Sequence, residues 1–219
     1  DADEIESVSA AMSAEELLVR RYGKFSAAKG LVYPEFDENT HVIAPFDIPP
    51  EWQSNISIDP GLNNPLSAHW YAVDGDGNVY VAAEHYEAGK DVDYHANAIK
   101  RICASLGWHG DGFGGYSALI DSAAGQRTLA ASKSVAELFS ERGINVNTKV
   151  NKDVFTGISR VKSYLSGENG KPKLFIFNTC VNMIREIKSY FWGDGDAPRK
   201  KDDHAMDELR YFLCSRPRP

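Results

Sequence analysis

The chain has 219 residues, a net charge of -7 and 42% hydrophobic residues. This length suits one large domain with enough apolar side chains for a sizeable core. No apolar run approaches the roughly 20 residues of a membrane span, so we expect no membrane partner. Three scattered cysteines without a CxxC pair favour reduced, buried residues of a cytosolic protein over a disulfide framework or a zinc site.

Charge is unevenly distributed along the sequence. Residues 1–140 hold 9 Lys and Arg against 21 Asp and Glu, which gives -12, whereas residues 141–219 hold 15 against 10, which gives +5. A basic surround on an acidic pocket suits a site that binds a polyanion through metal ions. Chance asymmetry between solvated faces explains the same numbers equally well.

The first 52 residues carry few signals of regular structure. Residues 1–12 are acidic and aperiodic, and the capping box Ser13-Ala14-Glu15-Glu16 predicts a short helix through about Lys29. We interpret residues 1–29 as a tail or linker remnant. Residues 30–52, rich in proline and aromatic side chains, are expected to form an ordered arm at the start of the domain, which spans residues 30–219.

Three predicted strands follow in a meander. Residues 55–59 alternate in polarity and end in Asp59 before Pro-Gly. Residues 68–73 and 79–84 flank the turn at 74–78, which predicts a hairpin beside the first strand.

From residue 93 onward, predicted helices and strands alternate. Helices are expected from an Asp93 cap to Gly107, around residues 135–139, after an Asp153 cap, over residues 180–190 and at the carboxy-terminal end. The strands between them cover residues 116–121, 144–148 and 173–177. This order predicts an α/β fold with a mixed sheet of about five main strands, a meander of three and then parallel strands, with helices on both faces.

Two of these strands end in an acid, at Asp59 and at Asp121. If the strands are adjacent and parallel, both carboxylates emerge at the same sheet edge. The final helix can bring Asp207, and with it Asp203 (i, i+4), to that edge. Converging carboxylates repel one another and persist only when cations neutralise them. Oxygen ligands suit Mg²⁺ or Mn²⁺, and two such ions are the standard device for hydrolysing a phosphodiester.

Each of these residues also has a structural interpretation when it is taken singly. Asp59 and Asp121 are typical turn formers. Asp203 is a typical N-cap of the last helix, and His204 can hydrogen-bond a carbonyl. Glu84, at the end of a strand near the first acid, is either an accessory ligand or a structural residue.

Four stretches together resemble a known family. Residues 30–36, Ile58-Asp59-Pro60-Gly61, Leu119-Ile120-Asp121 and residues 203–211 are similar to the RNase H-like (retroviral integrase-like) superfamily. More narrowly, they resemble the nuclease domain of the large terminase subunit of tailed bacteriophages. The resemblance covers residues 30–213. It implies that Asp59, Asp121 and Asp207 are metal-binding catalytic acids supported by His204 and Asp203.

The resemblance also implies an activity and partners. The expected activity is two-metal endonucleolytic cleavage of concatemeric double-stranded DNA, with Mg²⁺ or Mn²⁺, in the cytoplasm of a bacterial host. Expected partners in the full-length context are a packaging ATPase domain, the small terminase subunit and the portal. The family's large subunit carries an amino-terminal packaging ATPase, but this sequence has no G-x-x-x-x-G-K-[ST], so we expect no ATPase activity in this chain. Contacts to the DNA backbone are expected from Lys149, Lys152, Arg160, Lys200 and Lys201.

Alternatives to a terminase nuclease stay open at this point. A junction resolvase or a transposase-like nuclease uses the same fold and the same type of acid cluster. A non-catalytic docking module for packaging partners would keep the fold without the chemistry. An actin-like nucleotide-binding fold shares the sheet, but the expected glycine-rich phosphate loops are missing.

Overall fold

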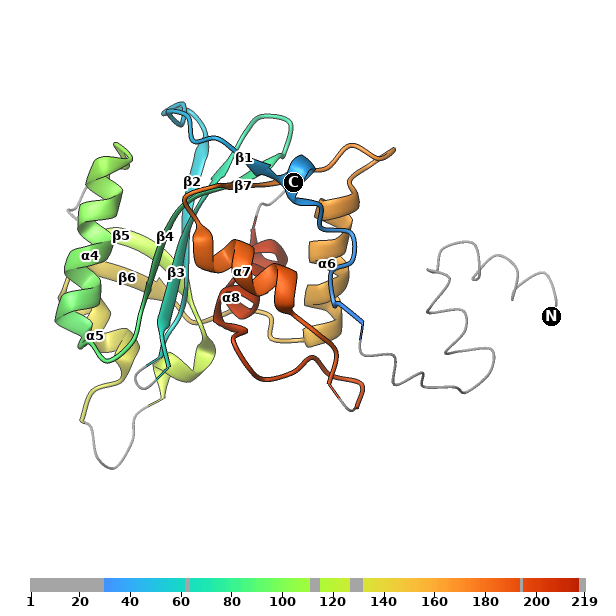
Figure 1. Cartoon of the computed structure of the whole chain (residues 1–219). Coiled ribbons are helices and arrows are strands. Elements are labelled where there is room, and N and C mark those ends of the chain that lie inside the picture. The colour runs from blue at the N-terminus through green and yellow to red at the C-terminus, as the bar shows by residue number, and fades with distance from the viewer. Residues whose placement is uncertain (1–29, 62–63, 111–114, 127–131, 194, 217–219) are drawn as a thin grey trace, which may run out of the picture.

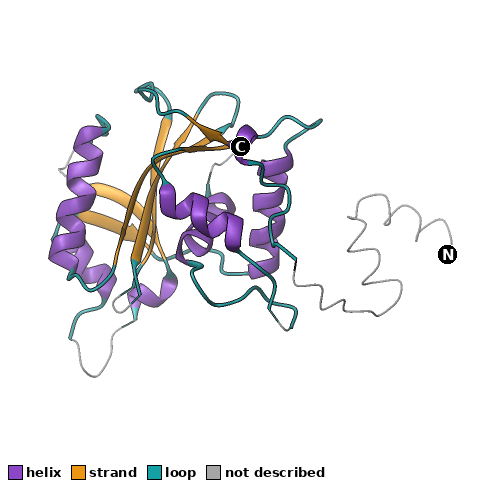
Figure 2. Ribbon diagram, viewed as in Figure 1, coloured by secondary structure: helices purple, strands orange, loops and turns teal. Residues whose placement is uncertain are grey.

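A seven-stranded sheet with helices on both faces forms the centre of the computed structural model, which describes residues 30–61, 64–110, 115–126, 132–193 and 195–216 (Figures 1 and 2). The helix predicted at residues 13–29 lies outside these ranges. The strands are β1 (Val42–Ile43), β2 (Gln53–Asp59), β3 (Leu66–Val73), β4 (Val79–Glu87), β5 (Tyr116–Ile120), β6 (Ile144–Asn147) and β7 (Leu174–Phe177). The helices are α3 (Glu38–His41), α4 (Val92–Ser105), α5 (Val135–Glu141), α6 (Val154–Ser166), α7 (Val181–Ser189) and α8 (His204–Ser215), with a 3-10 turn, η1, at Ser122–Gly125.

The order of the strands in the sheet is β1-β7-β4-β3-β2-β5-β6. Strands β2, β3 and β4 pair antiparallel, and β5, β6, β7 and β1 add to this meander in parallel. The predicted mixed sheet is therefore confirmed, with more strands than the five expected. One addition is β1, which pairs Val42 with Ile176 and comes from the arm predicted to hold little regular structure. A two-residue strand is too short to leave an alternating pattern in the sequence.

The sheet separates two hydrophobic cores. Helices α4 and α5 cover one face, and α6, α7 and α8 lie on the other (Figure 1). All eight residues of β3 are buried, because this central strand has packed side chains on both faces. Trp70 lies in the core under α4, and the next residue, Tyr71, lies in the core under α8. Within the described residues, no helix is both long enough and apolar enough to cross a lipid bilayer.

Polar side chains cap several of the helices, and one of these caps is a predicted one. Asp153 accepts a hydrogen bond from the Thr156 N–H at the start of α6. The predicted cap of α4 was wrong by two residues, because the carboxylate of Asp91 accepts the Tyr94 N–H at 2.8 Å. Asp93 lies inside the first turn and pairs with Arg142 of the α5 end instead.

Candidate active site

The ends of β2 and β5 bring two acidic residues to one edge of the sheet. The strands run parallel and pair Ile58 with Ile120, so Asp59 and Asp121 are the next residues on neighbouring strands. The backbone N–H of Asp121 also donates to the Ile58 carbonyl at 3.3 Å. This arrangement confirms the expectation that both acids leave the sheet at the same edge.

Helix α8, the last helix along the chain, brings the third acid to this edge. It packs against β2, β3 and β5, and the Ser57 hydroxyl donates to its Glu208 carbonyl at 2.9 Å. One turn further along, the Tyr211 hydroxyl donates to Asp121 Oδ2 at 2.7 Å. Burial raises the pKa of Asp59, and the charges of Asp207 and Asp121 raise it further. Asp59, Asp121 and Asp207 therefore form one electrostatically coupled cluster, which we call the acid cluster.

Asp59 and Asp121 are each held by partners of their own. The His204 Nδ1 lies 2.9 Å from Asp59 Oδ2, and this hydrogen bond raises the pKa of His204. Asp121 accepts from the Lys152 ammonium at 2.9 Å and from the Ala123 N–H at 2.6 Å. Burial by itself would raise the pKa of Asp121, but these donors, together with Tyr211, lower it.

Asp207 is held from two sides. The Lys200 ammonium lies 3.1 Å from its Oδ2, and the buried Arg210 guanidinium donates to its Oδ1. Arg210 is itself fixed by Tyr190, whose hydroxyl accepts from Nη1 at 2.9 Å. A Cβ on Gly157 of α6 would lie 2.7 Å from Arg210 Cδ, so the missing side chain lets α6 pack closely against α8 here.

The side chain of Asp203 does not cap helix α8. Asp203 occupies the N-cap position, but its side chain makes no capping hydrogen bond and lies 3.2 Å from the Lys200 ammonium instead. The Ala205 N–H is capped by Glu186 of α7, at 2.7 Å. The Glu186 carboxylate therefore caps α8 in place of Asp203. The Asp203 side chain lies beside Lys200, which also contacts Asp207.

Glu84 does not join the acid cluster. Its carboxylate accepts from the N–H groups of Asn182 and Met183 at the start of α7 and contacts His69 Nε2 at 2.9 Å. His69 Nδ1 contacts Glu208, whose carboxylate also accepts from the Tyr71 hydroxyl at 3.0 Å. We call His69, Tyr71, Glu84 and Glu208 the buried network. Of the two possible roles for Glu84, the structural one is observed.

Electrostatics within the buried network favour a charged histidine. Burial alone would lower the pKa of His69, but the charges and hydrogen bonds of Glu208 and Glu84 raise it to about 9. Burial also raises the pKa of Glu208, to about 7, although His69 opposes the shift. Because Glu208 is fully buried, this network fixes α8 to the sheet on the side away from solvent.

The five basic residues expected at DNA lie in different settings. Lys152 and Lys200 contact the acid cluster. Arg160 of α6 donates to the Leu213 carbonyl at 3.3 Å and stacks over Tyr164. Lys149 and Lys201 are exposed.

Three residues of the site were not predicted from the sequence. Tyr211 lies four residues after Asp207, a spacing that places both on one helix face and was a usable signal. Arg210, three residues after Asp207, has the same kind of signal. Glu186 has none, because its role depends on how α7 packs against α8.

The chemistry of the acid cluster is that of an oxygen-ligand site for hard cations. The side chains of Asp59, Asp121 and Asp207 are 14%, 11% and 15% exposed, so all three can be reached from solvent. As the side chains stand in the described part of the chain, no three His, Cys, Asp or Glu residues are grouped to hold one ion. Lysine ammonium groups instead supply the positive charge beside Asp121 and Asp207.

Several solved structures share this fold. The large terminase from the thermophilic bacteriophage D6E, in complex with ADP, is 24% identical over 93% of this chain and 52% of its own, with a TM-score of 0.68. The P22 large terminase nuclease domain is 18% identical over 85% of this chain and 92% of its own, with a TM-score of 0.69. The large terminase nuclease from the thermophilic phage G20c with bound cobalt is 13% identical over 86% and 97%, with a TM-score of 0.58, and it was also crystallised with bound zinc.

These likenesses concern the fold, and this chain spans about half the length of the D6E protein. A search of curated proteins finds no match. The sequence model of one family, described as the terminase RNase H-like domain, matches residues 56–216, well over half of the chain. The matched range begins within β2 and includes all three acids and the whole of α8. The chain therefore belongs to the terminase RNase H-like domain family.

Proposed function

We propose that this chain is a metal-dependent endonuclease that hydrolyses phosphodiester bonds of double-stranded DNA, as the nuclease part of a viral genome-packaging terminase that cuts concatemeric DNA. One arrangement carries the proposal: β2 and β5 bring Asp59 and Asp121 to one sheet edge, and α8, which carries Asp207, contacts both acids through His204 and Tyr211. Such a cluster is costly unless cations neutralise it.

The donors of the acid cluster fit divalent cations. Three carboxylates offer only oxygen ligands, which suit Mg²⁺ or Mn²⁺. Bound cobalt and zinc in the G20c nuclease support divalent-ion binding in this fold. We propose that Asp59, Asp121 and Asp207 hold two such ions. Ions of this kind, when bound, supply Lewis acidity toward the scissile phosphate and the attacking water.

The surrounding residues fix the geometry of these carboxylates. Tyr211 and the Ala123 N–H orient Asp121, and Arg210 orients Asp207. His204 orients Asp59 through its Nδ1, which leaves Nε2 as a polar group beside the cluster. These contacts limit the orientations of the carboxylates, and preorganised charges of this kind are a main source of catalytic rate.

The proposed setting follows from the family. Lys149 and Lys201, both exposed, are candidates for DNA backbone contacts, which carry no sequence information. We propose the cytoplasm of a bacterial host as the compartment. A packaging ATPase domain, the small terminase subunit and the portal are the proposed partners in the full-length protein.

Plasmid nicking with added Mn²⁺ tests the activity. We expect the wild-type chain to convert supercoiled plasmid to open-circular and linear forms, and Asp59→Asn to abolish conversion. Asp47→Asn is the matched control, because it makes the same chemical change at an exposed position before β2. Cleavage by Asp59→Asn at the wild-type rate would contradict the proposal. Faster cutting of a four-way junction than of linear duplex would favour a resolvase.

A further inference from the structure

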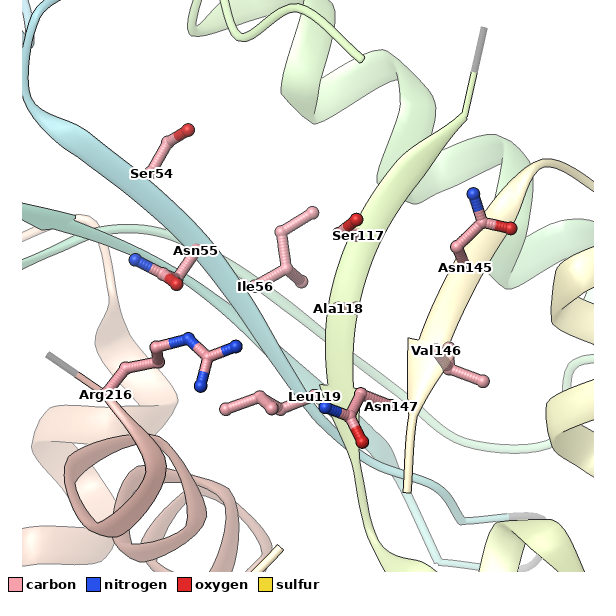
Figure 3. Close-up of a pocket in the computed structure, with 10 residues that line it drawn as sticks. All are labelled: Ser54, Asn55, Ile56, Ser117, Ala118, Leu119, Asn145, Val146, Asn147 and Arg216. Carbon is pink, nitrogen blue, oxygen red and sulfur yellow. The ribbon is translucent and has the colours of Figure 1, made fainter. Parts of the chain in front are cut away.

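A polar groove lies on the α8 side of the sheet, over β2, β5 and β6 (Figure 3). Its volume is ≈ 330 Å³ and it is open to solvent. Asn55, Ser117, Leu119, Asn145, Asn147 and Arg216 are among the residues that line it, and the Arg216 side chain extends from the end of α8 toward the strands (Figure 3). None of the lining residues is acidic, although the chain as a whole has a net charge of -7.

The composition of this groove is unusual for its place in the fold. Parallel strands are normally covered on both faces and are therefore apolar throughout. Strands β2, β5 and β6 are parallel, yet Ser117, Asn145 and Asn147 are exposed. Asparagine is also depleted in strands, so the local preference of these residues opposes the structure they adopt. Such conflicts concentrate at functional positions.

The groove and the acid cluster share two structural elements, β5 and α8. On β5, Leu119 pairs with Asn147 and lies two residues before Asp121. On α8, Tyr211 donates to Asp121, and Arg216 lies five residues later, immediately after the last residue of the same helix.

We infer that this groove binds the sugar-phosphate backbone of the DNA strand on one side of the scissile phosphate, an inference that rests on the proposed endonuclease function. The Arg216 guanidinium offers a planar fork of donors that matches a phosphate. In the described part of the chain, no carboxylate lies within salt-bridge distance of it, and its Nη1 donates to the Ser215 carbonyl at 2.9 Å. Asparagine and serine side chains are common phosphate and sugar contacts that position DNA without reading its sequence.

A peptide is a poorer occupant for this groove. Protein interfaces depend on buried aromatic and aliphatic anchors at their centre. Figure 3 shows Ile56, Leu119 and Val146 interspersed with amide, hydroxyl and guanidinium groups, and no aromatic side chain lines the groove. The absence of acids and the presence of an arginine complement a polyanion instead.

Fluorescence anisotropy with a labelled duplex tests the inference, in buffer without divalent cations so that cleavage does not interfere. We expect Arg216→Ala to weaken binding about 3- to 10-fold and to lower the slope of log K against log salt by about 0.9, the value of one phosphate contact. Arg216→Lys should restore the slope, since the charge returns. Ser117→Asp, which adds a negative charge to the floor, should weaken binding at least as much as Arg216→Ala.

Matched controls lie on α4, across the sheet. Arg101→Ala and Ser105→Asp make the same chemical changes at exposed positions and should stay within twofold of wild type. In Mn²⁺-dependent cleavage, Arg216→Ala should raise KM and leave kcat within twofold. Wild-type affinity and slope in both Arg216→Ala and Ser117→Asp would overturn the groove assignment, as would a wild-type chain that binds no duplex.

The two proposals fail in distinguishable ways. A wild-type chain that cleaves DNA while Arg216→Ala binds normally contradicts the groove alone. A chain that binds DNA through Arg216 but never cleaves it with Mn²⁺ contradicts the endonuclease and leaves the groove as a DNA contact.

Discussion

Acidic residues on the two sides of α8 are neutralised in opposite ways. Asp207 belongs to the acid cluster, which faces solvent and meets ammonium groups from the half-exposed Lys152 and the exposed Lys200. Glu208, the next residue, is fully buried and meets His69 and Tyr71 of the sheet. Surface ion pairs contribute little to stability, whereas breaking a buried pair leaves an uncompensated charge. We infer that the acid cluster serves chemistry and the buried network serves the placement of α8.

The largest expected effect separates the two regions by activity. Asp121→Asn should reduce Mn²⁺-dependent plasmid cleavage at least about 10³-fold, roughly 4 kcal/mol of transition-state stabilisation, because a metal-binding charge is lost. Its unfolding free energy should change by less than about 1 kcal/mol, since the amide oxygen still accepts from the Ala123 N–H and the amide NH2 can donate to the Tyr211 hydroxyl oxygen. Cleavage rates and urea unfolding of the same preparation measure both quantities. A large loss of stability in this variant would contradict the expected difference between the acid cluster and the buried network.

Glu208→Gln should give the reverse pattern. The amide keeps the shape of the side chain but removes a charge beside His69, and breaking a buried pair costs about 3–5 kcal/mol. We expect a loss of about 3 kcal/mol in unfolding free energy, read from the urea midpoint at constant m-value. Glu141→Gln on the exposed end of α5 is the matched control and should change stability by less than about 0.5 kcal/mol. Equal stability of the two variants would show that the buried network does not hold α8.

The pH dependence of stability tests the buried network without mutation. The pKa of His69 is raised from 6.5 to about 9, so its contribution is complete below pH 6.5 and is lost as pH rises through about 9. Between these values the unfolded chain releases a proton that the folded chain keeps. Stability should therefore fall by about 2 kcal/mol between pH 7 and pH 9.5, measured by urea unfolding at each pH.

Glu208→Gln supplies the control for this titration. It removes one of the two carboxylates that raise the pKa of His69, so the alkaline decline should become shallower. A decline of the same steepness in the variant would assign the titration to other groups.

The sequence predicts the acids of the acid cluster better than it predicts their partners. Asp59 and Asp121 were predictable because strand alternation and the residues that end a strand are local signals. Their adjacency was a condition of the hypothesis, and the parallel pairing of β2 with β5 meets it. The contacts made by other segments were not predictable, because Lys152 and Lys200 come from loops and Glu186 comes from α7, and their approach depends on how these segments pack.

Helix α8 itself is where the sequence pattern was least informative. Met206, Leu209, Phe212 and Leu213 recur at helical spacing in the sequence, which predicts one buried face and a separate acidic face. In the structure, residues 208–213 are all buried, including Glu208 and Arg210. A charged side chain in a helical pattern is normally assigned to solvent. Only tertiary contacts, here with β3 and Tyr190, reveal that these two charges are satisfied inside the protein.

The smallest expected effect concerns the cations of the acid cluster. Lys152→Ala removes an ammonium group that competes with a metal ion for Asp121, so Mn²⁺ should bind about two- to threefold more tightly. Stability without metal should fall by less than about 1 kcal/mol, because the lysine side chain is 46% exposed. The dependence of Tm on Mn²⁺ concentration, measured without DNA, reports this affinity because an ion that binds the folded state stabilises it. Lys133 forms an exposed ion pair with Glu141, so Lys133→Ala is the control and should leave the Mn²⁺ response unchanged. Weaker Mn²⁺ binding in Lys152→Ala would mean that the lysine helps to position the carboxylates of the acid cluster. The charged contacts of both regions would then position side chains, and the two regions would differ only in how strongly they do so.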